Sequence, residues 1–175
     1  MHKILTLSLL LFISGLSAGD LKLPKSFVSS FSQVITNPKG SKIKYKGTLN
    51  FSDKVFLKWE YKTPTKKEVC LNGKVITIVD HDLEQISKYK DPGNFNLSQV
   101  VSNAKRRTKT IYTTKVDEKL YTILIDSSKR IRSIAYFDNM DNKVQVTFNK
   151  IKYTNKPLLN KDLICSEPKI YDNIR

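Results

Sequence analysis

The fold is decided by residues 47–85, GTLNFSDKVFLKWEYKTPTKKEVCLNGKVITIVDHDLEQ. Large apolar and aromatic side chains alternate with polar ones over residues 43–51 and again over 55–61. A period of two residues is typical of a strand that buries one face. Thr63-Pro64-Thr65 should end the second of these strands, because proline has no N–H to donate to a neighbouring strand.

The pair Asn72-Gly73 is the strongest hairpin signal in the chain. It separates predicted strands over residues 68–71 and 74–79, and a further strand is expected over 83–89. The stretch is therefore predicted to form an antiparallel meander with its large apolar side chains on one face.

The second half of the chain continues the same pattern. Strands are predicted over residues 108–116, 120–125, 131–137, 143–153 and, at the end, 163–165. The segments between the first four are rich in Asp, Asn, Ser and Lys, which suits hairpin turns. Apolar positions change from even to odd numbers between Phe148 and Ile151, which predicts a β-bulge there.

Two segments are predicted to be helical. In residues 20–35, Pro24 suits the first turn of a helix, and the apolar residues recur at spacings of three and four. A second, short helix is expected around Leu97, Val100 and Val101. This helix could be a lid or an ordinary amphipathic helix on a sheet, and the residues alone favour the ordinary helix.

These elements add up to about nine to eleven strands, and so long an antiparallel meander must curl. The predicted fold is mostly β with two or more covering helices. It is an antiparallel incomplete (open) β-barrel whose concave side the helices cover.

Residues 1–18 have the form of a secretory signal peptide. Lys3 precedes an almost continuous apolar run, and cleavage is expected near Ala18 or Gly19. The apolar run is too short to span about 30 Å of hydrocarbon. No cysteine follows the cleavage region, so no lipid anchor is expected at the new N-terminus. Residues 19–175 are predicted to form a single exported domain.

The chain is strongly basic, with a net charge of +15. In an exported protein such charge would meet anionic lipid or acidic proteins, and no nucleic acid is expected as a partner. Lysine is also the usual solvent-facing residue of an alternating strand. The one dense cluster, Lys105-Arg106-Arg107 with Lys109, is a candidate contact to a membrane or a protein.

The residues offer little to catalysis. His81 is the one histidine after the signal segment, and a single imidazole between Asp80 and Asp82 is a weak metal signal that a turn explains better. A Cys70–His81 nucleophile pair is conceivable, but an exported chain with a second cysteine favours a bridge. Neither an enzyme nor a cofactor or metal is predicted.

Cys70 and Cys165 are the only cysteines. Two thiols in an exported chain are more often bridged than free. Closing a loop of about 95 residues would stabilise the fold by roughly 4–5 kcal/mol in the chain-entropy model. We predict a structural disulfide that joins the last strand to the strand over 68–71.

An ordered series of residues adds a specific resemblance. The series consists of Gly47, Phe51, Trp59, Pro64, Asn72-Gly73-Lys74, Asp80 and Leu83-Glu84-Gln85, preceded by Ser26-Phe27 and Ser30-Phe31-Ser32-Gln33. It resembles LolA, the family of periplasmic outer-membrane lipoprotein carriers. The resemblance implies an open β-barrel with a helical lid over an apolar cavity.

The resemblance also implies roles for particular residues. Without it, the large apolar side chains would simply be a packed core. With it, a cavity for lipoprotein acyl chains is expected to be lined by Phe27, Phe31, Tyr45, Leu49, Phe51, Leu57, Trp59 and Tyr61. Leu97, Val100 and Val101 would belong to the lid, and Lys54 is the candidate contact that holds it. Family members often have a basic residue and a proline in that turn; here the proline is missing, and lysine lacks the forked bonds of arginine.

The predicted function is therefore that of a periplasmic carrier. It would take triacylated lipoproteins from an inner-membrane releasing transporter to an outer-membrane lipoprotein acceptor, acting as a monomer. The alternatives are a related periplasmic lipid- or glycolipid-binding or sensor module of the same fold and, less favoured, an anchored acceptor or a hydrolase.

Overall fold

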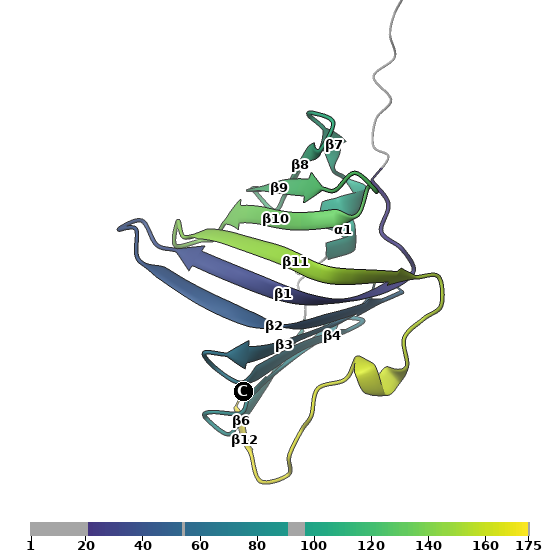
Figure 1. Cartoon of the computed structure of the whole chain (residues 1–175). Helices are drawn as coiled ribbons and strands as arrows, with labels where there is room; N and C mark the ends of the chain where they lie inside the picture. Colours follow the sequence, from purple (N-terminus) through teal and green to yellow (C-terminus); the bar gives the residue numbers. More distant parts are fainter. Residues whose placement is uncertain (1–20, 54, 91–96, 175) are drawn as a thin grey trace, which may run out of the picture.

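A computed structural model describes residues 21–53, 55–90 and 97–174 as one twelve-stranded sheet. From edge to edge the strand order is β12-β6-β5-β4-β3-β2-β1-β11-β10-β9-β8-β7, and the two edges do not meet (Figure 1). The strands are β1 (Ser26–Thr36), β2 (Lys42–Ser52), β3 (Phe56–Thr63), β4 (Lys67–Asn72), β5 (Val75–Asp80), β6 (Gln85–Lys90), β7 (Lys105–Arg106), β8 (Ile111–Val116), β9 (Lys119–Ile125), β10 (Ile131–Phe137), β11 (Lys143–Thr154) and β12 (Asp172–Ile174). The predicted mostly-β, open architecture is confirmed.

The first predicted helix is wrong: over Ser26–Thr36 the chain forms β1, near the middle of the sheet. β1 pairs antiparallel with β2 on one side and β11 on the other. Phe27 and Phe31 are four residues apart, a spacing that fits a helix and also two steps of a strand. Pairing with β2 and with the distant β11 decides between them, and the intervening serines are poor helix formers.

The central meander forms as predicted. β2 to β6 pair in sequence order, and Gly73 takes a positive φ of 61° in the turn between β4 and β5. The predicted bulge also forms: β1 pairs Val28 with Lys152 but Ser30 with Asn149, so β11 contains one extra residue. Lys150 lies in this bulge with a φ of 53°.

One α-helix, α1 (Leu97–Ser102), is present in the part of the chain that the structure describes, so the expectation of two or more covering helices is wrong. Val100 and Val101 are buried, and α1 packs on the concave side of the sheet near β8. The short strand β7, which follows α1, has no counterpart in the prediction. None of the described helices has the length and apolar character needed to cross a membrane.

The C-terminal segment crosses the opposite, convex face of the sheet (Figure 1, yellow). It contains a 3₁₀ turn, η1 (Asn160–Asp162), and ends in β12, which pairs parallel with β6. Residues 163–165, predicted as a strand, have no ladder partner. They are joined to the sheet through side chains instead, namely by the Cys70–Cys165 disulfide and by a hydrogen bond from Lys58 to the Ile164 carbonyl.

Candidate functional site

An apolar cavity of about 130 Å³ lies between the concave face of the sheet and α1. Strands β1, β3, β9, β10 and β11 form its wall, and α1 covers it. The lining side chains are Gln33, Leu57, Trp59, Tyr61, Leu97, Val100, Tyr121, Ile134, Tyr136, Val146 and Phe148. No Asp, Glu, Lys or Arg is among them.

Three of the predicted wall residues line this cavity side by side on β3, namely Leu57, Trp59 and Tyr61. Their odd numbers place them on one face of the strand. Two predicted lid residues, Leu97 and Val100, line it from α1, whereas Val101 is buried in the core beside it.

The other predicted wall residues lie behind the lining. Phe31 meets the rings of Trp59 and Tyr61 edge-on, with centroids 4.8 and 5.2 Å away. Tyr45 contacts Tyr61 from the side at 5.7 Å. Phe27, Leu49 and Phe51 are almost fully buried in the core. These residues fix the position of the wall without lining the cavity.

Six lining residues were not predicted, namely Gln33, Tyr121, Ile134, Tyr136, Val146 and Phe148. The last four lie on the even-numbered face of β10 and β11, so the alternation in those strands could have identified them. Gln33 was not predicted as a lining residue, because residues 20–35 were interpreted as a helix. On a strand it shares the concave face with Phe31.

Gly47 makes the aromatic wall possible. It pairs with Phe31 on β1 and Tyr61 on β3, between two large rings. A Cβ at this position would overlap the backbone oxygen of Glu60 and lie 2.8 Å from Phe31 Cε1. The absence of a side chain therefore lets Phe31 reach Tyr61 across β2.

The tyrosines of the cavity are neutral. Burial raises the pKa of Tyr61, with smaller contributions from the neighbouring Tyr136 and Tyr45 hydroxyls. Burial also raises the pKa of Tyr136 to about 12, helped by Tyr121 and Asp138. A wall without charge at neutral pH suits an uncharged, apolar ligand.

Comparisons with known proteins identify the family. The family model for the outer membrane lipoprotein carrier protein LolA matches residues 23–161. The chain belongs to the LolA family. It is 34% identical to an outer-membrane lipoprotein carrier protein from Campylobacter jejuni over 168 residues, which cover 94% of this chain and 95% of the relative. It is 28% identical to one from Helicobacter hepaticus, over 73% of this chain and 72% of the relative.

Solved structures show the same fold at much lower identity. An uncharacterized conserved protein from Thermus thermophilus superposes with a TM-score of 0.56 and 11% identity, covering 87% of this chain and 91% of its own. A LolA superfamily protein from Nitrosomonas europaea gives 0.50 and 9%, over 83% and 93%. The resemblance inferred from the ordered residue series is thus confirmed, and a family of carriers agrees with the prediction that the chain is not an enzyme.

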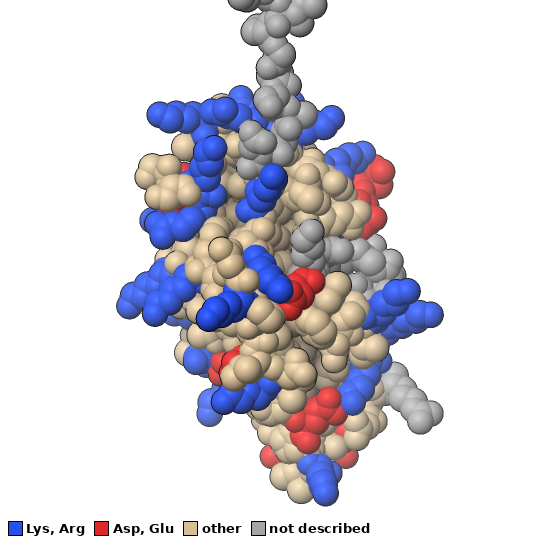
Figure 2. All heavy atoms as spheres, turned by 90° about the vertical axis from the view of Figure 1, so that its right-hand side faces the viewer, with Lys and Arg blue, Asp and Glu red and all other residues tan. Residues whose placement is uncertain are grey.

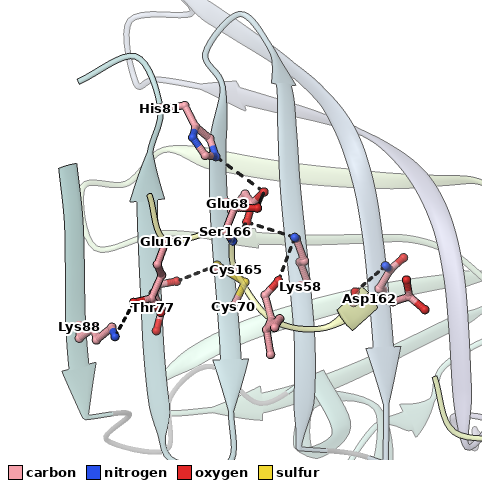
Figure 3. Close-up of a disulfide and its surroundings, with 12 residues drawn as sticks. Lys58, Glu68, Cys70, Thr77, His81, Lys88, Asp162, Cys165, Ser166 and Glu167 are labelled. Carbon is pink, nitrogen blue, oxygen red and sulfur yellow. Dashed lines mark hydrogen bonds and ion pairs between the residues drawn. A yellow bond between two sulfur atoms is a disulfide. The ribbon is translucent and has the colours of Figure 1, made fainter. Parts of the chain in front are cut away.

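The convex face of this LolA family member carries the disulfide between Cys70 and Cys165 (Figure 3). The pairing is as predicted, but Cys165 lies in the C-terminal segment rather than on a strand. Side chains of the sheet hold the same segment at intervals: Asn50 donates to the Asp162 carbonyl at 2.7 Å, and Lys58 to the Ile164 carbonyl at 2.9 Å.

A buried ionic cluster lies next to the disulfide. Glu68, only 7% exposed, is 3.1 Å from Lys58 Nζ and accepts the Ser166 N–H at 2.7 Å. His81 Nε2 is 3.7 Å from the other Glu68 oxygen, and its Nδ1 is 3.2 Å from the Tyr171 hydroxyl. His81 is therefore used in attaching the C-terminal segment.

Glu68, Cys70 and Cys165 are also the one group of potential metal ligands that the described residues bring within 4.8 Å. The two sulfurs are bonded to each other, so they do not act as ligands.

The remaining predicted features lie on the surface or outside the described residues. Lys and Arg side chains are scattered over the face in Figure 2 rather than gathered in one patch. The cluster of Lys105, Arg106, Arg107 and Lys109 is exposed at the β7 edge, where Arg107 Nε donates to Thr113 Oγ1 at 2.7 Å. Lys54 and the signal segment lie outside the described residues.

Proposed function

We propose that this chain carries the acyl chains of lipoproteins in the cavity between the sheet and α1, moving them across the periplasm to the outer membrane. The observation that supports this most directly is an uncharged apolar cavity in a member of the lipoprotein carrier family. Each buried CH₂ contributes about 0.8 kcal/mol, so an acyl chain is strongly held away from water without any covalent chemistry.

The cavity must enlarge to take its load. Its volume of about 130 Å³ is well below the roughly 300–1,000 Å³ of ordinary ligand pockets. The sheet is continuous through many hydrogen bonds, whereas α1 is six residues long. Moving α1 away from β3 and β10 is therefore the least costly way to open space over Leu57 and Trp59. Leu97 and Val100 would act as the lid.

Two partners and a location complete the proposal. An inner-membrane releasing transporter would supply triacylated lipoprotein, and an outer-membrane acceptor would take it by offering more favourable burial. The carrier would act as a monomer, after removal of residues 1–18. Residues Lys105, Arg106 and Arg107 are candidates for contact with a partner or a membrane surface, since they are exposed beside the lid.

The test is release of lipoprotein from spheroplasts. Inner membranes with radiolabelled lipoproteins are incubated with the purified protein, and the supernatant is examined for a one-to-one complex. Leu57→Glu, which puts a carboxylate into the cavity wall, should abolish the complex. Tyr121→Glu, at a less buried lining position, should do the same with less risk to folding.

The matched control is Phe56→Glu, which makes the same kind of change on the neighbouring residue of β3, on the opposite face. It should leave release intact. Normal release by folded Leu57→Glu and Tyr121→Glu proteins would refute the cavity as the binding site. If the wild type released nothing with its native transporter present, its bound lipids should be extracted to test the lipid- or glycolipid-binding alternative.

A further inference from the structure

Two polar atoms in the cavity wall have no hydrogen-bond partner. They are Oε1 of Gln33, an acceptor, and Nε1 of Trp59, a donor. Each atom is buried, and these are the two such atoms without a partner among the residues that the structure describes. Both residues line the cavity, and Gln33 as a whole is only 9% exposed. Buried polar side-chain atoms are usually paired, so two exceptions in one apolar cavity require an explanation.

The residues paired with Gln33 or packed against Trp59 make no hydrogen bond to these atoms. Gln33 lies on β1 between Val146 of β11 and Tyr45 of β2, and the backbone groups there belong to the strand ladders. Trp59 is packed against Phe31 edge-on at 4.8 Å and lies 6.3 Å from the ring of Phe148. An apolar residue at position 33 would fit such surroundings better than glutamine. A ligand that enters the cavity is the partner that this amide lacks in the empty protein.

We propose that Gln33 and Trp59 form a polar subsite that binds the amide group of an N-acylated ligand. This proposal rests on the carrier function proposed above. An amide supplies one N–H for Gln33 Oε1 and one carbonyl oxygen for Trp59 Nε1. An ester, the other common link to an acyl chain, has acceptors only and would leave Gln33 Oε1 unpaired. A carboxylate is disfavoured, since none of the described residues that line the cavity is cationic.

The subsite would give the carrier a means of selection that an apolar wall cannot provide. Apolar burial depends on chain length and hardly distinguishes how the chain is attached. A site that hydrogen-bonds an N–H discriminates against a ligand that lacks it, because a buried acceptor is then left unpaired. Cargo with an acyl amide would be preferred over cargo whose chains are all linked through esters.

The experiment compares two synthetic lipopeptides. One is a cysteinyl peptide with an N-palmitoyl amide and an S-diacylglyceryl group; in the other, an ester oxygen replaces the amide N–H. One acyl chain in each is brominated, and binding is followed by quenching of Trp59, the only tryptophan in the chain. The wild type should bind the amide about tenfold more tightly, the size of one lost hydrogen bond.

The variants are Gln33→Leu and Gln33→Met, which keep the volume and remove the amide. Both should bind the two lipopeptides equally, and their urea midpoints should rise because a buried unpaired group is gone. Val34→Leu, the next residue on β1 and on the opposite face of the strand, should keep the wild-type ratio of the two affinities.

Two outcomes would overturn the subsite while leaving the carrier function intact. One is equal affinity of the wild type for the amide and ester lipopeptides. The other is a preference for the amide that persists in both Gln33 variants. Failure of the wild type to bind either lipopeptide would overturn the carrier function itself, and the subsite with it.

Discussion

Gly47 illustrates at the scale of one residue how the cavity wall depends on a missing side chain. We expect Gly47→Ala to lower the free energy of unfolding by at least about 2 kcal/mol, since the new Cβ collides with backbone and an immobile ring. It should also weaken acyl binding, because Phe31 must retreat from Tyr61. Urea unfolding and Trp59 fluorescence would measure the two effects.

A glycine elsewhere gives the control for this prediction. Gly73 has a φ of 61°, and no atom would lie within 4 Å of an added Cβ. Asparagine tolerates that backbone conformation, so Gly73→Asn should change the free energy of unfolding little. A similarly small effect for Gly47→Ala would show that β2 can shift away from Glu60, and that the close contact does not fix the wall.

Glu68 shows a second kind of residue-scale constraint. Its carboxylate lies between Lys58 and His81 and accepts two bonds from Ser166. A buried ion pair is weak support for stability as such, because both charges lose water. Its value here is positional, since Lys58 holds in place the carboxylate that accepts the two Ser166 bonds and so attaches the C-terminal segment to the sheet.

At the scale of elements, two hairpin turns in the second half of the sheet use the same device. Asp126 Oδ1 accepts the N–H groups of Ser128 and Arg130, each at 2.9 Å. Asp138 Oδ1 accepts those of Met140 and Asn142 at 2.9 and 3.0 Å. Each carboxylate thus closes its turn from within.

These bonds predict how stability depends on pH. The N–H and side chain of Arg130 hold the pKa of Asp126 below its usual range, and the Asn142 amide, with two backbone N–H groups, does so for Asp138. A carboxyl whose pKa is lower in the folded state stabilises the fold above its unfolded pKa, near 4, and that contribution is lost as the pH falls through the folded pKa. The free energy of unfolding should therefore fall below about pH 4.

The Asp126→Asn/Asp138→Asn double variant should be less stable than the wild type at pH 7. Solvent screening limits the difference to no more than about 1 kcal/mol. The difference should close under acid conditions, because the wild-type carboxyls are then protonated as well. Urea unfolding from pH 7 to pH 2.5 would test this. Asp141→Asn, in the same turn as Asp138, should follow the wild-type curve, and a difference that persists at pH 2.5 would contradict the prediction.

The elements also show what the sequence can and cannot predict. The alternation in β2 and β3, the turn at Gly73 and the bulge at Lys150 follow from local residue patterns, and all were predictable. β1 was not, because its apolar spacing fits both a helix and a strand, and only its pairing with β2 and β11 decides. Because residues 20–35 were interpreted as a helix, Gln33 was not recognised as a cavity residue. Its place in the cavity depends on which strands lie beside β1, and no local pattern contains that information.

At the scale of the whole molecule, two layers flank the sheet in different ways. The C-terminal segment is fixed to the convex face by a disulfide and by several hydrogen bonds, among them those from Asn50 and Lys58 and those to Glu68 (Figure 3). On the concave face α1 is only six residues long, and its buried contacts come mainly from Val100 and Val101. If the cavity opens to take cargo as proposed, we therefore expect the concave side to move and the convex side to stay fixed.

This asymmetry predicts the response to cargo. A helix of six residues is not stable by itself, so displacement from the sheet should unfold α1 or expose its amides. On loading with the triacylated lipopeptide, hydrogen exchange at the amides of residues 97–102 should accelerate about tenfold or more. The amides of β1, between β2 and β11, should keep their exchange rates and serve as the internal reference. Slower exchange in α1 on loading would mean that the helix closes over the acyl chains, and that the cavity enlarges by movement of the sheet instead.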